Sequence, residues 1–183
     1  MENRRSRMTK RLIKEALTDL LEQEDIHCIS VRMLCEKADI NRSTFYLHYE
    51  TIDDLLEDFT NDYMRSIWQS ERKPMDQKDY EQIIAYILAN PSPYRALLKS
   101  GLYHQYILRQ YEGIDFEQNP AYRQYDRNSF RMISTYTIAG TEQMLLYVLD
   151  HPDEQFRISN LAAVIYHLNT SATNQIKQLT NHS

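Results

Sequence analysis

Apolar residues recur three and four positions apart along most of this 183-residue chain, and this spacing constrains the fold more than any other feature. It matches the period of an α-helix with one apolar face, and no stretch shows the alternation that is typical of a half-buried strand. Glycine occurs three times, at Gly101, Gly113 and Gly140, and proline five times, so turn residues are scarce and long helices are favoured. The sequence therefore predicts an all-α protein.

The chain lacks the residue patterns of several functional sites. Its glycines lie too far apart for a Gly-rich phosphate loop or a dinucleotide fingerprint. Cys28 and Cys35 form no CxxC pattern, and the six histidines are scattered without ligand spacing. The N-terminus carries no apolar signal segment, and the longest apolar run, 144–149, is too short to span a bilayer. We therefore expect a cytoplasmic protein that is not an enzyme, with no metal, cofactor or membrane partner.

Capping residues and helix breakers divide the chain into segments. An amphipathic helix is predicted over 9–24, and Ser30, Asn41 and Thr51 are candidate caps of the next three helices. Asp54, three residues after Thr51, completes a capping box. Breaks at 73–74 and 90–93 separate further helices predicted over 76–89, 93–100, 102–112, 121–149 and 156–179, with Ser92 as a cap, Gly101 as a stop and a loop over 113–120.

The segments predict two domains, a three-helix domain over 1–50 and a helical domain over 51–183, joined through the fourth helix. In the first domain two short helices are joined by a short turn and follow a longer helix, which is the pattern of a helix-turn-helix domain. The last helix of such a domain enters the major groove of DNA. Double-stranded DNA is therefore the expected partner.

The segment INRSTFYLHY (40–49) carries polar side chains that a helix built only for packing does not need. On a helix over 42–49, Phe45 and Tyr49 lie one turn apart and can both face the core. The remaining side chains suit guanine, base edges and phosphate oxygens. The candidate DNA-binding residues are Asn41, Arg42, Ser43, Thr44, Tyr46 and His48. The alternative is that Tyr46 and His48 are ordinary surface residues.

The net charge of −5 argues against nucleic acid, but the charge is unevenly distributed. Residues 1–14 hold six Lys or Arg against Glu2 alone, whereas residues 51–183 hold 12 basic and 17 acidic residues. A basic tip on an acidic body predicts an arm that adds affinity for DNA, with Arg4, Arg5 and Arg7 as candidates. The alternative is a solvated tail.

The stretch INRSTFYLHYETIDDLL (40–56) resembles the recognition-helix signature of the TetR (tetracycline repressor, TetR/AcrR) family of transcription regulators. That signature has a hydrophobe, a cap, a basic or small pair, then Thr-Leu/Phe-Tyr-x-His-Phe, a helix start and Leu-Leu. The resemblance covers about 9–68 and includes SVRMLCEKADI (30–40). It implies that Arg42, Ser43 and Thr44 lie in the groove, that Tyr46 and His48 contact phosphates, that Arg32 lies near the DNA backbone, and that Cys35 packs in the core.

Three positions depart from the family pattern. Asp25 and Asp39 stand where glycine is common, so these two turns are expected to differ slightly. Ile52 stands where a lysine usually helps to hold phosphate. Contact with phosphate is therefore expected to depend more on the basic N-terminal arm.

The last two predicted helices resemble those through which such regulators dimerise, so a homodimer is expected. Their apolar stripes could meet a second copy around a two-fold axis. The predicted interface residues are Phe130, Ile133, Thr137, Gly140, Met144, Leu161, Ile165, Leu168 and Ala172. The alternative is that both stripes belong to the core of the single chain.

The helical body is rich in tyrosine, and a cavity lined by such rings suits an aromatic or amphipathic effector of unknown identity. The candidate pocket residues are Trp68, Tyr80, Tyr94, Tyr103, Tyr106 and Tyr136, although tyrosines are also ordinary half-buried helix residues. The resulting hypothesis is a homodimeric repressor that a small molecule releases from a palindromic operator. The alternatives are a helix-turn-helix regulator controlled by a protein partner and, less simply, an all-α binding protein without DNA contact.

Overall fold

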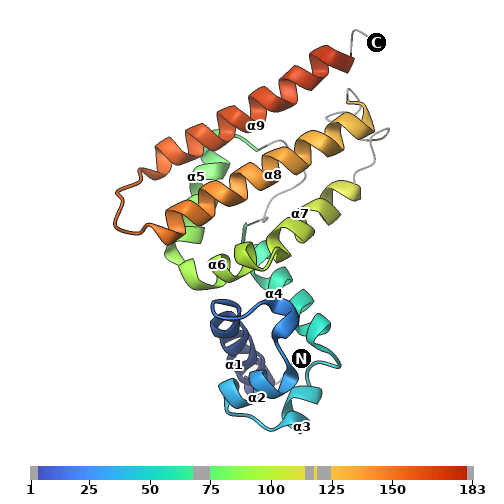
Figure 1. Cartoon of the computed structure of the whole chain (residues 1–183), viewed down its shortest axis with the longest axis vertical. Helices are drawn as coiled ribbons and strands as arrows, with labels where there is room; N and C mark the ends of the chain where they lie inside the picture. Colours follow the sequence, from blue (N-terminus) through green and yellow to red (C-terminus); the bar gives the residue numbers. More distant parts are fainter. Residues whose placement is uncertain (1–3, 68–74, 114–117, 119–124, 181–183) are drawn as a thin grey trace. The chain divides into compact units, whose positions relative to one another are not determined.

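The computed structural model describes residues 4–67, 75–113, 118 and 125–180. These residues form nine α-helices and one 3₁₀ helix and contain no strand, so the all-α prediction is confirmed (Figure 1). The chain divides into two compact units. Residues up to Ser66 together with Ser92–Tyr103 form the N-terminal unit, and Ile67–Pro91 together with His104–Ser183 form the C-terminal unit. This division rests on contacts within the chain, and the functional division expected at residue 50 stays a prediction.

The N-terminal unit is built around a core of apolar side chains from its helices. Ile13, Leu17, Leu34, Phe45 and Phe59 are fully buried in it, and burying each such side chain contributes about 1.5–3 kcal/mol. α1 packs on α2, and α2 packs on α3. The elements of this unit are α1 (Arg4–Leu21), η1 (Ile26–Cys28), α2 (Val31–Ala38), α3 (Arg42–Tyr46), α4 (Ile52–Ile67) and α6 (Pro91–Lys99).

Local capping bonds form at the second and fourth helices as the sequence predicts. The hydroxyl of Ser30 accepts from the backbone N–H of Met33 at 3.3 Å and caps α2. The hydroxyl of Thr51 accepts from the backbone N–H of Asp54 at 3.1 Å, and the carboxylate of Asp54 accepts from the backbone N–H of Thr51 at 2.9 Å. These two bonds form the predicted capping box of α4. Both devices join residues three positions apart, and this is why the sequence alone reveals them.

Several helix boundaries differ from those predicted. α1 starts at Arg4 and not at residue 9, because Arg, Lys and Met are good helix formers and continue the helix into the basic segment. α3 ends at Tyr46 and not at residue 49, since the N–H groups of His48 and Tyr49 both turn back to the carbonyl of Phe45.

A further difference lies between the fifth and sixth helices. α6 begins at Pro91, a favourable residue for the first helical position. The predicted cap, Ser92, instead donates a hydrogen bond of 2.8 Å to the carboxylate of Glu22. Gly101 ends this segment with a φ of 74°, as predicted for a helix stop. Most of the predicted loop over 113–120, and residues 121–124 of the predicted eighth helix, lie outside the described residues.

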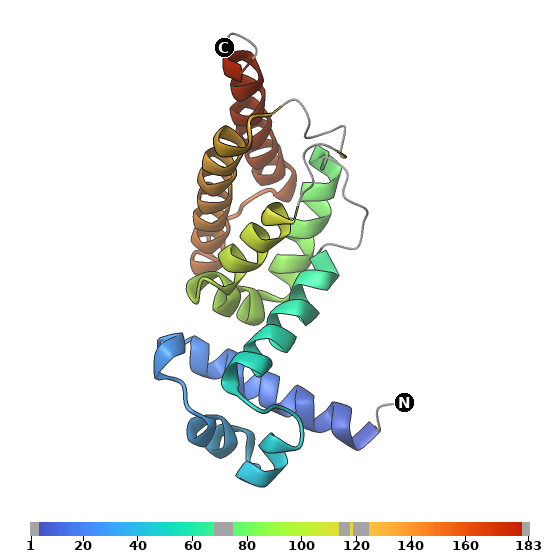
Figure 2. The same cartoon turned by 90° about the vertical axis from the view of Figure 1, so that its right-hand side faces the viewer.

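The C-terminal unit is a packed group of long helices. α9 packs on both α5 and α8, and Figures 1 and 2 show α8 and α9 running side by side in opposite directions. Ile84, Ile87, Leu145 and Ile165 are buried in its core. The helices are α5 (Gln77–Ala89), α7 (Leu102–Glu112), α8 (Arg127–Asp150) and α9 (Ile158–Thr180). None of the helices in the described part of the chain is long and apolar enough to cross a membrane.

Candidate nucleic-acid interface

The short helix α3 has one buried side and one exposed side. Phe45 is fully buried, and Tyr49, just beyond the helix, is 4% exposed with its ring 5.8 Å from that of Phe45. Both were predicted to face the core, and this is confirmed. Arg42, Ser43 and Tyr46 are exposed, as contact with a nucleic acid requires.

Thr44 and His48 are half-buried, unlike the other predicted residues of this face. Thr44 borders the groove described below. The Nδ1 atom of His48 lies 3.5 Å from the hydroxyl of Ser6 in α1, which leaves Nε2 as the ring nitrogen that can meet a phosphate. His48 therefore links the residues that follow α3 to α1.

Leu47 was not predicted as a functional residue, yet its side chain is 81% exposed at the end of α3. On a helical wheel it lies opposite Phe45 and Tyr49, so the sequence already carried the signal. An apolar side chain on this face can contact the methyl group of thymine.

A groove lies between α1, α2 and α3 of the N-terminal unit. Three arginines and two carboxylates line it, so it presents charges of both signs. The side chain of Arg32 donates to Glu36 at 2.7 Å, and this carboxylate raises the pKa of Arg32. A guanidinium has further N–H groups for phosphate. The groove is lined by Arg5, Thr9, Arg32, Cys35, Glu36, Asp39, Ile40, Asn41, Arg42 and Thr44.

Asn41 occupies the N-cap position of α3, but its side chain makes no capping hydrogen bond. The predicted cap is therefore present in backbone conformation alone. Its exposed amide offers both a donor and an acceptor at the rim of the groove. Asn41 is thus placed for contact with a base or a phosphate.

The basic segment at the start of the chain is helical from Arg4 onward. Arg4, Arg5 and Arg7 are exposed on the first turns of α1. Lys14 belongs to the same basic stretch of the sequence, but its side chain is buried, with 8% of its surface exposed. Its ammonium contacts Asp58 and Asp62 of α4, so the arm carries less available positive charge than the sequence suggests.

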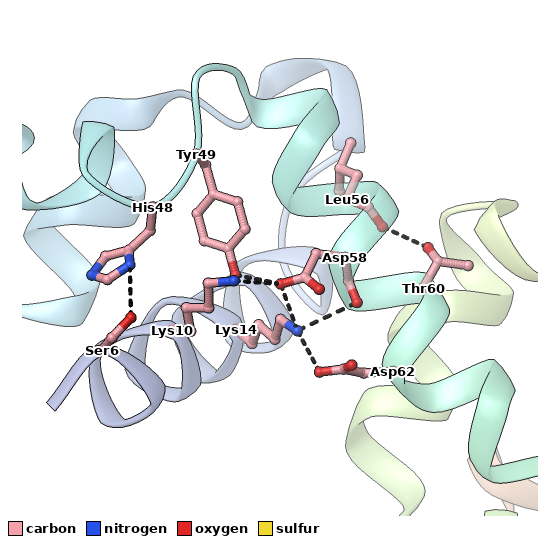
Figure 3. A network of polar contacts seen from close by, with 9 residues as sticks. All are labelled: Ser6, Lys10, Lys14, His48, Tyr49, Leu56, Asp58, Thr60 and Asp62. Carbon is pink, nitrogen blue, oxygen red and sulfur yellow. Dashed lines mark hydrogen bonds and ion pairs between the residues drawn. The ribbon is translucent and has the colours of Figure 1, made fainter. Parts of the chain in front are cut away.

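Asp58 lies at the centre of a network of polar contacts between α1, α4 and Tyr49 (Figure 3). It accepts a hydrogen bond of 2.7 Å from the hydroxyl of Tyr49 and forms an ion pair of 2.9 Å with the ammonium of Lys14. Burial acts to raise the pKa of Asp58, but the hydrogen bonds and positive charges of Lys14, Tyr49 and Lys10 outweigh it and lower the pKa overall. The carboxylate is thus held in its charged form.

The tyrosines predicted to form an effector pocket are divided between the two units of the chain. Tyr94 is fully buried in the N-terminal unit, where its hydroxyl donates to the carbonyl of Tyr63 at 2.8 Å. Tyr136 is 72% exposed on α8. Tyr80 is bonded to Asn169 in the C-terminal unit, and burial raises its pKa. Of the others, Tyr103 is buried in the N-terminal unit, Tyr106 is half-buried in the C-terminal unit, and Trp68 lies outside the described residues.

The C-terminal unit contains a cavity of about 170 Å³ between α7 and α8, and none of the predicted tyrosines is among its lining residues. Tyr111 and Phe130 form its aromatic wall, with ring centroids 5.6 Å apart. Arg127 and Arg131 add positive charge at its edge. Between the same two helices, the buried Glu142 accepts a hydrogen bond from His104 at 2.8 Å, while its second oxygen has no partner among the described residues.

The residues predicted for a dimer interface fall into two groups. Phe130 and Ile165 are buried within the chain itself. Leu168 is exposed, and the remaining six are half-buried along α8 and α9: Ile133, Thr137, Gly140, Met144, Leu161 and Ala172. Among the described residues of these helices, the large apolar side chains that are exposed are Met132, Tyr136, Tyr147, Val164 and Leu168. Their contact with a second copy stays a prediction.

Within the described residues, no cluster of three or more His, Cys, Asp or Glu side chains could hold a metal ion. Cys35 is buried, as predicted for a packing residue, and burial raises the pKa of its thiol.

Known proteins resemble the chain in two ways. No protein-family model matches it. A stretch of 50 residues is 40% identical to an uncharacterized HTH-type transcriptional regulator, YxbF, from Bacillus subtilis (strain 168). This match spans 27% of the chain and 13% of the length of that relative.

Two solved structures share the fold over nearly their whole length. A TetR transcriptional regulator from Streptococcus agalactiae 2603V superposes with a TM-score of 0.58 at 18% identity, covering 91% of this chain and 96% of that one. The dihydroxyacetone kinase operon activator DhaS superposes with a TM-score of 0.50 at 21% identity, covering 92% and 96%. At these identities the likeness is one of fold.

Proposed function

We propose that this chain, which has the fold of a TetR transcriptional regulator, is itself a TetR-family regulator that binds double-stranded DNA. It acts in the cytoplasm without enzymatic activity. The observation that carries the proposal is the division of α3. Phe45 and Tyr49 anchor the segment in the core, while Arg42, Ser43 and Tyr46 project from the opposite side. Such a short, firmly anchored helix with polar outer residues is the reading element of a helix-turn-helix domain.

The surroundings of α3 support the same conclusion. Arg5, Arg32 and Arg42 all line the groove, and Arg4 and Arg7 are exposed on the first turns of α1. Contacts to phosphate fix the position of a protein on DNA, and contacts to base edges provide specificity. In this proposal Arg42 and Ser43 read bases, with Asn41 and Thr44 beside them. Arg4, Arg5, Arg7, Arg32, Tyr46 and His48 hold phosphates.

The proposed active form is a homodimer on a palindromic operator, because one recognition helix contacts few base pairs and a second copy adds an equal half-site. The exposed apolar side chains of α8 and α9, such as Tyr136 and Leu168, support association through these helices. A small-molecule effector in the C-terminal unit would favour a state in which the two recognition helices no longer fit successive major grooves.

The protein is proposed to repress transcription. Whether it represses or activates can be measured directly. One of the two structures described above belongs to a protein named as an operon activator. A reporter gene behind the bound promoter should be expressed more strongly in a strain that lacks the protein. Weaker expression in that strain would make the protein an activator and would leave DNA binding unaffected.

Selection of bound duplexes from a random-sequence DNA library tests the proposed function. The expected result is enrichment of an inverted repeat whose half-sites are centred about 34–36 Å apart, or a multiple of this distance. A matched selection with an Arg42→Ala, Tyr46→Ala double variant should enrich no repeat. If the wild-type protein enriches no sequence either, it is not a sequence-specific DNA-binding protein.

A further inference from the structure

We infer that Asp58 of α4 is a positioning residue for DNA recognition, which holds the recognition segment through Tyr49 and the basic helix α1 through Lys14. The inference rests on the proposed DNA-binding function and adds to it the contacts that orient the reading helix. None of the residues in this network needs to touch DNA. Their role is to determine the direction in which α3 and α1 present the residues that do.

Tyr49 connects α3 to the network. Its ring is almost completely buried beside Phe45, and its hydroxyl donates to the Oδ2 atom of Asp58 at 2.7 Å (Figure 3). Packing alone requires only the ring, and a phenylalanine would fill the same space. The hydroxyl adds a directed bond to a charged acceptor, which restricts the ring far more than apolar contact does. Because Tyr49 follows α3 by three residues, restricting Tyr49 restricts α3.

Lys14 connects α1 to the same carboxylate. Its ammonium lies 2.9 Å from Oδ2 of Asp58, bonds the backbone carbonyl of Asp58 at 3.3 Å and also contacts the carboxylate of Asp62. Lys10, one turn earlier, lies 3.9 Å from Asp58 and 5.5 Å from the centre of the Tyr49 ring. One carboxylate thus receives contacts from two turns of α1 and from the end of the recognition segment.

The arrangement of charges separates this role from direct binding of phosphate. Lys10 and Lys14 face two carboxylates, Asp58 and Asp62, so the network carries little net charge. Lys14 is 8% exposed and its ammonium already has three partners. A lysine that held phosphate would release counterions from DNA and steepen the salt dependence of binding, whereas a positioning lysine leaves that slope unchanged.

Operator binding by Tyr49→Phe, Asp58→Asn and Lys14→Met variants tests the inference. Two probes are used at several salt concentrations: a duplex that the wild-type protein selects from a random library, and a shuffled duplex of equal length. All measurements are made where far-UV circular dichroism shows the variant to be folded. Glu57→Gln is the control, because it removes the same charge as Asp58→Asn from an exposed neighbour on α4.

We expect each of the three variants to bind the selected duplex about tenfold more weakly, which is the order of one lost hydrogen bond to a charged group. Binding to the shuffled duplex and the salt slope should stay as in the wild type. Loss of stability alone would lower the unfolding midpoint and leave the preference of the folded protein for the selected duplex unchanged. In a double-mutant cycle, Tyr49→Phe and Asp58→Asn should not be additive, since one removes the donor and the other the charge of the acceptor in the same hydrogen bond.

Unchanged preference in both Tyr49→Phe and Asp58→Asn would overturn the inference while leaving the proposed function intact. A Lys14→Met variant that loses affinity for both duplexes, with a slope lower by about 0.9, would show a phosphate contact in place of a positioning one. If Asp58→Asn does not fold, Tyr49→Phe decides the question because it keeps the buried ring. A wild-type protein without preference for any duplex would overturn the proposed function, and the inference with it.

Discussion

Arg42 and Tyr46 lie on the same exposed side of α3 but are expected to affect DNA binding differently. Arginine pairs with guanine through two hydrogen bonds, and this contact carries about 1–3 kcal/mol of base discrimination. Arg42→Ala should therefore weaken operator binding and relax the preference at one base pair. Tyr46→Phe and His48→Ala remove groups proposed to meet phosphate, so they should weaken binding to all sequences alike.

Titration of the variants against operators with single base-pair changes distinguishes these effects. A Tyr46→Phe, His48→Ala double variant that binds its operator as tightly as the wild type would remove these two residues from the proposed interface.

Asp39 shows how a single residue can keep a turn that usually needs glycine. It follows α2 with φ 51° and ψ 50°, in the left-handed region where a side chain is unfavourable by about 1–2 kcal/mol. Asp39→Gly should raise the free energy of unfolding by up to about 1 kcal/mol, after allowance for the greater freedom of glycine in the unfolded chain. It also removes a carboxylate from the groove, so DNA binding should strengthen.

The matched change is Asp25→Gly, at the second position where the family often has glycine. Asp25 has a φ of −65° and accepts a hydrogen bond of 2.8 Å from the N–H of His27. Glycine would relieve no backbone strain at this position and would remove the cap. Urea unfolding should therefore show a free energy of unfolding that is lower by a few tenths of a kcal/mol. An increase in the free energy of unfolding for both Asp39→Gly and Asp25→Gly would refute the explanation that the left-handed backbone of Asp39 causes the effect.

At the scale of elements, the first turns of α1 are expected to supply affinity without specificity. Replacing Arg4, Arg5 and Arg7 with alanine keeps the helix, because alanine has the highest helix propensity. The plot of log affinity against log salt should become less steep by about 0.9 for each phosphate contact that is lost. Arg157→Ala, an exposed change at the C-terminal unit, is the control and should leave the slope unchanged. An unchanged slope in the triple variant would show that this turn does not contact phosphate.

The contact between α7 and α8 contains a buried carboxyl group that should make stability depend on pH. Burial raises the pKa of Glu142, although the hydrogen bond and charge of His104 lower it in part. A raised pKa means that the folded protein holds the proton more tightly than the unfolded chain does. The neutral carboxyl therefore favours folding below the ordinary pKa of glutamate, and this contribution is lost as the pH rises through the raised value.

Glu142→Gln should therefore increase the free energy of unfolding at neutral pH, by about 1 kcal/mol, because the variant no longer buries a charged group with one unpaired oxygen. This increase in the free energy of unfolding should become smaller at about pH 4, where the wild-type carboxyl is protonated. Urea unfolding at both values measures the difference. Glu112→Gln, at an exposed glutamate of α7, should show no such dependence, and an equal gain at both pH values for Glu142→Gln would contradict the role of ionisation.

At the scale of the whole molecule, Gly140 offers a test of dimerisation through α8. A Cβ atom at Gly140 would have none of the described atoms that lie outside the neighbouring helix backbone within 4 Å, so the position has room for the start of a larger side chain. Gly140→Trp should therefore fold normally but separate two copies that meet at this point, since overpacking a close contact costs about 1–3 kcal/mol. The variant should sediment as a smaller species and lose operator binding, with its far-UV helical signal unchanged.

Thr135→Trp, at an exposed position elsewhere on α8, is the control and should still dimerise. A wild-type protein that sediments as a monomer at micromolar concentration would rule out the dimer. A Gly140→Trp protein that dimerises and binds DNA would place the interface on another surface.

Features that depend on neighbours along the chain could be predicted from the amino-acid sequence. Helical periodicity predicted the α class, and bonds between residues three apart predicted the caps at Ser30 and Thr51. The spacing of Phe45 and Tyr49 predicted the buried side of α3, and hence which residues remain outside. Each of these follows from the geometry of a single helix turn, which residues close in sequence share whatever the rest of the chain does.

Roles that depend on partners far along the chain became visible in the folded structure. Lys14 counted as part of a basic arm until Asp58 and Asp62, more than forty residues later, were found to neutralise it. Tyr94 and Tyr136 look alike in sequence, yet one is fully buried and the other is 72% exposed. Composition records that a charged or aromatic side chain exists. Its effect on free energy depends on whether folding places it next to an opposite charge, in the apolar core or in water.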